Sequence, residues 1–143
     1  MINNMKILCM SHGKMAEGVV QSAKMIVGDV KYLDYVNAYV DKDVDVDNQI
    51  KHYLAENAGQ TIIVCTDIFG GSVNNNWLRY MKQEKNIYLV AGLSLPLLIE
   101  LVLGLGKKSN ENINSIIERA IENAKNSVKF CNEIDFEVTK DDF

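Results

Sequence analysis

Met5-Lys-Ile-Leu-Cys-Met-Ser-His-Gly-Lys-Met-Ala-Glu-Gly18 is the stretch around which the rest of the chain is interpreted. An apolar run, Ile7 to Met10, ends at Ser11-His12-Gly13, and a helical pattern follows at once. This order predicts a buried strand from about Lys6 to Ser11, a short turn and a helix. A helix N-terminus favours negative charge, because its first backbone N–H groups lack helical partners and the helix dipole is positive there. His12 is therefore a candidate to accept a phosphoryl group or to bind an anion.

The composition indicates a soluble globular protein. The chain has 143 residues, 48% of them hydrophobic and 24% charged, with a net charge of −4. This length suits one domain with a proper core, expected to comprise residues 1–143. The chain has no run of basic residues, so its sequence does not indicate nucleic-acid binding. The polar start of the chain does not resemble a signal peptide. The most apolar stretch, 93–106, is too short to span a bilayer. A cytoplasmic location is expected.

Other chemistry-bearing residues give no site of their own. Cys9, Cys65 and Cys131 show no C-x-x-C spacing, so neither a disulfide framework nor a cysteine zinc site is supported. The acidic run 41–47 lacks the glycine and the final glutamate that a calcium loop requires. His52 stands beside a lysine in a polar helix and is expected to face solvent. The chain has no nucleotide-binding fingerprint, and we expect no metal or cofactor.

The periodicity of the remaining chain predicts strands that alternate with helices. The expected strands are 32–40, 60–66 and 86–91. The first three expected helices run from Met15 to a stop at Gly28, from a cap at Asp47 or Asn48 to 57, and over 73–83. The last two run from Pro96 to an end at Gly104 and Gly106, and along an apolar stripe from Ile113 to Cys131 that is capped by Ser109 or Asn110. Residues 134–138 alternate as a half-exposed edge strand does. This order predicts an α/β, doubly wound, mainly parallel sheet with helices on both faces.

Ligands of such sheets bind beyond the carboxyl ends of the strands, where the winding reverses. His12 follows the first strand, and the loop Asp67-Ile-Phe-Gly-Gly-Ser72 follows the third. In a flavodoxin-like order these two strands are neighbours, so His12 and Asp67 would meet. Asp67 could then accept a hydrogen bond from one ring nitrogen and leave the other free to attack phosphorus. The alternative is that each side chain only bonds the backbone of its own loop.

The glycines and the serine of the two loops fit the same chemistry. Gly13, Gly70 and Gly71 would let the backbone approach phosphoryl oxygens closely. Ser72, at the cap of the next helix, would offer a hydroxyl or simply close that helix. His12 and Asp67 are therefore the candidate catalytic residues, and these four form the candidate phosphoryl pocket.

Three separated blocks resemble the mannose-type enzyme IIA domain of the bacterial sugar phosphotransferase system. They are Ser11-His-Gly-Lys-Met-Ala-Glu-Gly18, Thr66-Asp-Ile-Phe-Gly-Gly-Ser72 with Asn75, and Val90-Ala-Gly-Leu-Ser-Leu-Pro96 with Glu100. The resemblance implies that His12 is phosphorylated, that Asp67 pairs with it, and that Gly70, Gly71 and Ser72 line the pocket. It further implies transfer from HPr to a IIB component, which phosphorylates a mannose-family sugar brought in by membrane IIC and IID subunits. The resemblance also implies a homodimer in which each copy exchanges a C-terminal strand with the other, and this strand is expected at 134–138.

The chain also departs from the family pattern. Val73 and Asn74 stand where Pro-Phe is common, and Ser94 stands where asparagine is usual. These departures are expected to affect loop shape and IIB specificity more than the chemistry.

Three other functions fit less well. The phosphoryl-donor subunit of a dihydroxyacetone kinase usually carries further domains, whereas this chain ends at Phe143. A non-catalytic regulatory or sensing module would not need both His12 and Asp67. A flavin-binding protein of this fold would carry a Ser/Thr-rich loop after the first strand.

Overall fold

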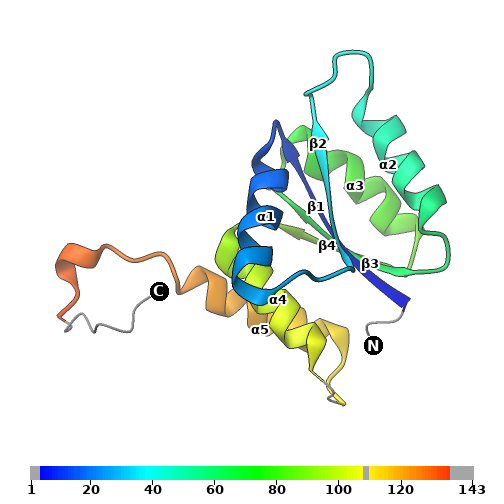
Figure 1. Ribbon diagram of the computed structural model, residues 1–143. Coiled ribbons are helices and arrows are strands. Elements are labelled where there is room, and N and C mark those ends of the chain that lie inside the picture. The colour runs from blue at the N-terminus through cyan, green and yellow to red at the C-terminus, as the bar shows by residue number, and fades with distance from the viewer. Residues whose placement is uncertain (1–3, 108–109, 136–143) are drawn as a thin grey trace.

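A parallel sheet of four strands forms the centre of the computed structural model, which describes residues 4–107 and 110–135 (Figure 1). The strands are β1 (Met5–His12), β2 (Leu33–Ala38), β3 (Thr61–Thr66) and β4 (Ile87–Ala91). Their order is β2-β1-β3-β4, and every neighbouring pair is parallel. This is the predicted flavodoxin-like arrangement, in which β1 and β3 are adjacent and the chain winds in opposite directions from them.

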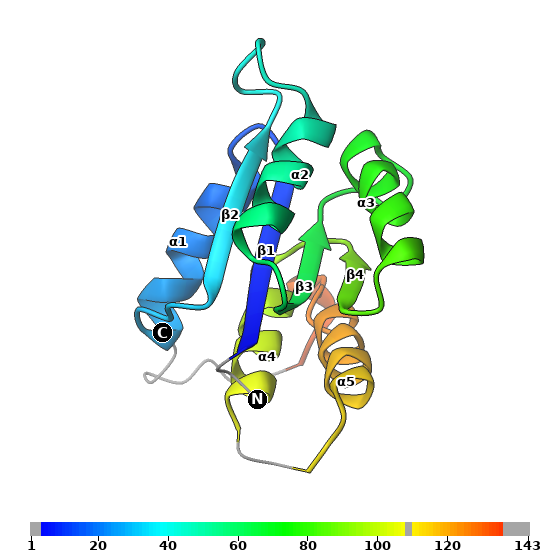
Figure 2. The same cartoon turned by 90° about the vertical axis from the view of Figure 1, so that its right-hand side faces the viewer.

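Helices cover both faces of the sheet (Figures 1 and 2). They are α1 (Met15–Val27), α4 (Leu95–Gly106) and α5 (Ile113–Lys125) on one face, and α2 (Val46–Glu56) and α3 (Ser72–Gln83) on the other. Successive residues of a strand point to opposite faces. Ile7 and Cys9 therefore join the core under α1, α4 and α5, while Leu8 and Met10 join the core under α2 and α3. Two covered faces explain why β1 and β3 are continuous apolar runs.

The caps of α2 and α5 are other residues than predicted, and α3 begins at Ser72 with Gly71, rather than Ser72, as its N-cap residue. The side chain of Asp45 caps α2 by accepting a hydrogen bond from the Asn48 backbone N–H at 2.7 Å. Asp47 lies inside the first turn, where its carboxylate pairs with Lys51 and Arg79. Asn112, rather than Ser109 or Asn110, caps α5 by accepting from the Ser115 N–H. In both helices the residue used is the one with an extended backbone immediately before the first helical turn.

The buried face of α1 contains only some of its apolar residues, and the apolar stripe of α5 is shorter than predicted. In α1, Ala16, Val20 and Ala23 are the buried residues, whereas Met15 and Ile26 are 43% and 50% exposed. The helix thus faces the sheet with its small side chains, which allow close approach. The stripe of α5 does not continue to Cys131, because the helix ends at Lys125 and Cys131 opens a short 3-10 helix (Cys131–Glu133).

The C-terminal segment leaves the edge-strand prediction only partly tested. Ile134 follows the 3-10 helix and is not part of a strand. The rest of the predicted strand, 136–138, lies outside the described residues.

Gly104 was expected near the end of α4, but it lies inside this helix, which runs to Gly106. A Cβ at Gly104 would be 2.8 Å from Cγ2 of Ile116, on the neighbouring α5. The missing side chain therefore lets the two helices pack closely.

Among the described residues no helix is both long and apolar enough to cross a membrane.

Replacing Gly104 tests this close packing. Gly104→Ala is expected to lower the free energy of unfolding by about 1–3 kcal/mol, because a buried β-branched side chain must shift to admit the methyl group. Gly18→Ala is the matched control, since Gly18 lies in α1 with no heavy atom within 4 Å of the added Cβ. It is expected to raise stability by up to about 1 kcal/mol through helix propensity. Urea unfolding measures both, and a Gly104→Ala protein as stable as Gly18→Ala would contradict the packing argument.

Candidate active site

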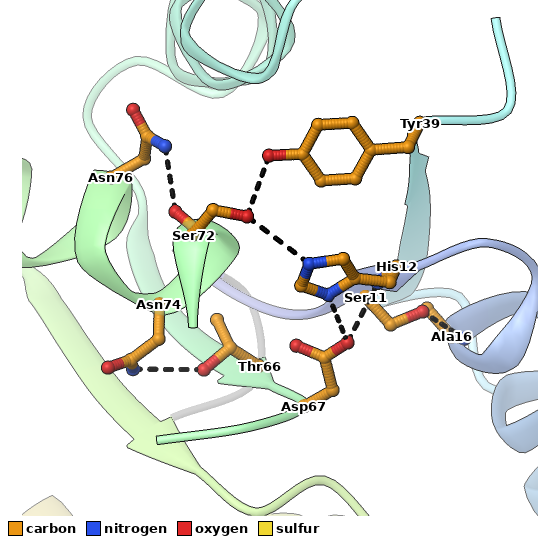
Figure 3. A network of polar contacts seen from close by, with 9 residues as sticks. All are labelled: Ser11, His12, Ala16, Tyr39, Thr66, Asp67, Ser72, Asn74 and Asn76. Carbon is orange, nitrogen blue, oxygen red and sulfur yellow. Dashed lines mark hydrogen bonds and ion pairs between the residues drawn. The ribbon is translucent and has the colours of Figure 1, made fainter. Parts of the chain in front are cut away.

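His12 and Asp67 meet at the carboxyl end of the sheet, as predicted. His12 is the last residue of β1, and Asp67 directly follows β3, which pairs with β1 in register Met10↔Thr66. One carboxylate oxygen, Oδ2 of Asp67, accepts two hydrogen bonds from His12, from the backbone N–H at 2.8 Å and from ring Nδ1 at 2.7 Å (Figure 3). The Asp67 side chain is 8% exposed and that of His12 45%. The carboxylate is thus held inside while the ring reaches the surface.

The surroundings of Asp67 favour its charged form. Burial alone would raise the pKa of this carboxyl group, because charge is poorly solvated there. Hydrogen bonds from the backbone and the ring of His12, and from the backbone of Ile68, outweigh burial and hold the pKa of Asp67 below its ordinary value. An ionised Asp67 can only accept, so Nδ1 of His12 must carry the proton that joins them. In the neutral ring, Nε2 is then the nitrogen with an available electron pair.

Ser72 and Tyr39 complete the contacts of the His12 ring. The Ser72 hydroxyl oxygen lies 3.2 Å from Nε2 and 2.7 Å from the hydroxyl of Tyr39. The Tyr39 ring stacks on the imidazole, with centroids 5.1 Å apart and an angle of 30° between the planes. Ser72 was predicted for this site, but Tyr39 was not. No local motif singles out Tyr39, because its contact depends on the turn that follows β2.

The three glycines lie in the turns after β1 and β3, and their amides already have partners. The N–H groups of Gly13, Gly70 and Gly71 donate to Ala38 O, to the side chain of Asn74 and to Ile68 O, respectively. Gly13 and Gly70 have φ values of 62° and 81°, which favour glycine. A Cβ at Gly71 would lie 3.2 Å from Ile68 O and 3.7 Å from Cε1 of His12. The glycines therefore shape the turns and let the start of α3 approach the imidazole.

The residues that depart from the family pattern have structural roles. Asn74 is 2% exposed and donates to the Thr66 hydroxyl at 3.0 Å, while its oxygen accepts from Gly70 N–H. It thereby ties the loop after β3 to the end of that strand. Val73 is fully buried in the core under α2 and α3. The Ser94 hydroxyl caps α4 by accepting from Leu97 N–H.

The other residues considered from the sequence stay apart from this site. His52 is largely exposed on α2 and pairs with Glu56 one turn later. Glu100 accepts a hydrogen bond from Asn123 on α5 rather than approaching Asp67. Cys9 is buried, and its hydrogen bond with Cys65, together with burial, raises the pKa of its thiol. No group of three His, Cys, Asp or Glu side chains that could hold a metal occurs in the described part of the chain.

The sequence matches a known family over most of its length. The family model described as the PTS system fructose IIA component matches residues 6–122. A structure described as a phosphoenolpyruvate-dependent sugar phosphotransferase system (PTS) permease from Klebsiella pneumoniae is 34% identical, with a TM-score of 0.83 and coverage of 91% of this chain and 93% of that one. The mannose/sorbose specific IIA subunit from Enterococcus faecalis is 27% identical, with a TM-score of 0.75 and coverage of 95% and 99%. The PTS IIA protein associated with the fucose utilization operon from Streptococcus pneumoniae is 28% identical, with a TM-score of 0.72 and coverage of 91% and 95%.

The fold and the matches agree on one class, the components of sugar phosphotransferase systems. The chain belongs to the family of PTS system fructose IIA components, which includes mannose/sorbose-type proteins. The resemblance stated from three sequence blocks is thereby confirmed. The family implies a transferase role and partners within the same system.

The charge of Asp67 is expected to stabilise the fold in a pH-dependent manner. A carboxyl group whose pKa is lower in the folded state stabilises the protein above its unfolded pKa of about 3.9, and this contribution is lost as pH falls through the folded value. Asp67→Asn keeps the shape and one acceptor but removes the charge, so it should lower the free energy of unfolding at pH 7 by about 1–3 kcal/mol. The difference from wild type should shrink below about pH 4.

Urea unfolding between pH 3 and pH 7 measures this difference. Asp43→Asn, at an exposed carboxyl group, is the control and should change stability by less than about 0.5 kcal/mol throughout. A difference between wild type and Asp67→Asn that stays constant down to pH 3 would show that the charge is not what stabilises the loop.

Proposed function

We propose that this protein is a phosphoryl carrier that takes phosphate from phospho-HPr onto His12 and passes it to a cognate IIB component. The observation that carries the proposal is the unequal environment of the two ring nitrogens. On a ring that is 45% exposed, Nδ1 is held by a buried carboxylate at 2.7 Å, while Nε2 has only the Ser72 hydroxyl at 3.2 Å beside it. A carrier needs this arrangement, because one nitrogen must be fixed and the other must reach a partner protein.

Nε2 of His12 is the proposed nucleophile. Its electron pair attacks the phosphorus of the donor's phosphohistidine in line, forming the Nε2–P bond as the donor's N–P bond breaks. The electron pair of the broken bond returns to the donor ring nitrogen. His12 loses no proton, since Nδ1–H stays bonded to Asp67, whose negative charge offsets the positive charge that develops on the imidazole. Transfer to IIB is the same step in reverse, and positioning and electrostatics contribute most of the catalysis.

The start of α3 fits the proposed phosphoryl position. The N-cap residue of α3 is Gly71, which has no side chain, so no cap side chain accepts a hydrogen bond from the backbone N–H groups of the first turn. These amides and the helix dipole favour the negative phosphoryl oxygens. The Ser72 hydroxyl would move from Nε2 to one of these oxygens. Gly13, Gly70 and Gly71 support the pocket through backbone shape.

Exposed apolar side chains beside His12 are proposed as the docking surface for HPr and IIB. They come from the first residue of α1 and from the loops at the carboxyl ends of β2 and β3, and their exposed fractions are 43% for Met15, 53% for Tyr39, 48% for Val40, 67% for Ile68 and 80% for Phe69. Clustered exposed apolar side chains mark interaction sites. Both partners would use this surface in turn, in the cytoplasm, and IIB would then phosphorylate a mannose-family sugar entering through IIC and IID.

We further propose that the protein is a homodimer that exchanges its C-terminal segment. β4 is an edge of the sheet and has no second neighbour strand among the described residues. After α5 the described chain runs away from the body of the molecule (Figure 1), and Val128 and Phe130 on it are 87% and 65% exposed. A strand from a second copy would pair the β4 edge and cover such side chains.

Phosphorylation of His12 is the central test. The protein is incubated with phosphoenolpyruvate, enzyme I and HPr, and its intact mass is recorded before and after mild acid. Wild type should gain one acid-labile phosphoryl group, and His12→Ala should gain none. His52→Ala is the matched control and should be phosphorylated like wild type, because His52 lies apart on α2. An unphosphorylated wild type in the presence of phospho-HPr would overturn the proposed function.

The docking surface is tested by Phe69→Ala. The side chain is 80% exposed, so its loss should leave stability within about 0.5 kcal/mol but remove apolar contact with the partner. We expect the KM for phospho-HPr to rise about tenfold with little change in kcat. Met25→Ala, an 88% exposed residue at the far end of α1, should change neither constant. Equal KM values for the two variants would place docking elsewhere.

A further inference from the structure

Tyr39 has a backbone conformation that sequence preference does not explain. It is the first residue after β2, with φ at 65°, and within the described residues it alone has a positive φ without being glycine. A tyrosine in this left-handed region is strained, whereas glycine would fit freely. Its side chain is also 53% exposed, so core packing does not account for it. Strained residues of this kind cluster at active sites and ligand-binding sites, where the surrounding structure holds them in place.

The turn that imposes this conformation brings the Tyr39 side chain to the reacting histidine. Ala38 O accepts a hydrogen bond from Gly13 N–H at 2.8 Å, which joins the end of β2 to the turn after β1. From there the Tyr39 ring lies stacked on His12, and its hydroxyl reaches the Ser72 oxygen at 2.7 Å (Figure 3). One side chain thus contacts both groups that face the proposed phosphoryl position.

The direction of each hydrogen bond that links Asp67, His12, Ser72 and Tyr39 follows from the charge of Asp67. Ionised Asp67 accepts from Nδ1, so Nε2 of the neutral ring has no proton and must accept from the Ser72 hydroxyl. That hydroxyl proton is then committed, so the Ser72 oxygen accepts the proton of Tyr39. Tyr39 therefore holds Ser72 by its oxygen and leaves its proton directed at Nε2. When a phosphoryl group arrives, the same proton can turn to a phosphoryl oxygen while the oxygen stays anchored.

We propose that Tyr39 is a positioning residue for phosphoryl transfer, acting through Ser72 and through the plane of the His12 ring. This role rests on the proposed carrier function. The Tyr39 hydroxyl keeps the Ser72 oxygen at the start of α3, where its proton serves the transferred group. The Tyr39 ring restrains rotation of the imidazole away from the line of attack. Tyr39 itself neither gives nor takes a proton in the transfer.

The hydroxyl of Tyr39 is tested by Tyr39→Phe, which keeps the ring and removes the bond to Ser72. We expect kcat for phosphoryl transfer from phospho-HPr to fall about three- to tenfold, the effect of one neutral hydrogen bond, with KM changed less than about twofold. Tyr35→Phe is the matched control, since Tyr35 is also an exposed tyrosine of β2 but is paired in register with Cys9, away from the site. It should leave both constants unchanged.

Coupling to Ser72 separates positioning from a structural role. If Tyr39 acts through Ser72, the double variant Tyr39→Phe with Ser72→Ala should be no slower than Ser72→Ala alone. Nitrogen NMR of the His12 ring adds a readout that needs no donor protein. Tyr39→Phe should move the Nε2 resonance while Tyr35→Phe should not, with unfolding midpoints unchanged.

The possible failures are distinguishable. A wild-type protein that phospho-HPr does not phosphorylate would overturn the carrier function, and the Tyr39 proposal with it. A phosphorylated wild type with Tyr39→Phe at wild-type kcat, or with a raised KM alone, would overturn the role of Tyr39 only. Fully multiplicative effects of the Tyr39 and Ser72 substitutions would also overturn it.

Discussion

The double hydrogen bond from His12 to Oδ2 of Asp67 is the interaction on which the site depends. It exists because β1 and β3 are adjacent and in register, so that their carboxyl ends emerge side by side. A single oxygen holds both the backbone and the ring of His12. The bond therefore fixes the end of β1, the ring orientation and the tautomer together, and burial of the carboxylate keeps water from competing for it.

The sequence predicts the sheet and the central pair because both depend on simple patterns. Continuous apolar runs at β1 and β3 indicate strands covered on both faces, and polar loops after them mark the ligand-binding edge. Helix boundaries are harder to predict, since Asp45, Asp47 and Asn48 are all suitable caps by residue type. Asp45 is selected by the backbone conformation before α2, while Asp47 forms ion pairs with another helix. Gly104 shows the same limit, because only the approach of α5 explains a glycine within a helix.

Tyr39 and Asn74 could not be assigned from the sequence for a different reason. Each acts through residues that are close only after folding. Tyr39 reaches His12 because a hydrogen bond between two turns sets the direction in which the chain leaves β2. Asn74 stands where the family commonly has phenylalanine, yet its amide joins Thr66 to Gly70 and holds the loop after β3. A buried amide with both functions satisfied can replace apolar packing as a means of fixing a loop.

The exposure of the site suits the proposed carrier better than an enzyme with an enclosed pocket. A small substrate is best surrounded, because exclusion of water strengthens the electrostatics of the site. A phosphohistidine on another protein cannot be surrounded by one domain, so the proposed transfer would require His12 to project to the surface while its supporting groups stay behind it. The side chains of Asp67 and Asn74 are buried, the His12 ring is half exposed, and Ile68 and Phe69 are largely exposed. In the proposed carrier the partner protein would complete the enclosure, and water would be excluded only while the phosphoryl group is being transferred.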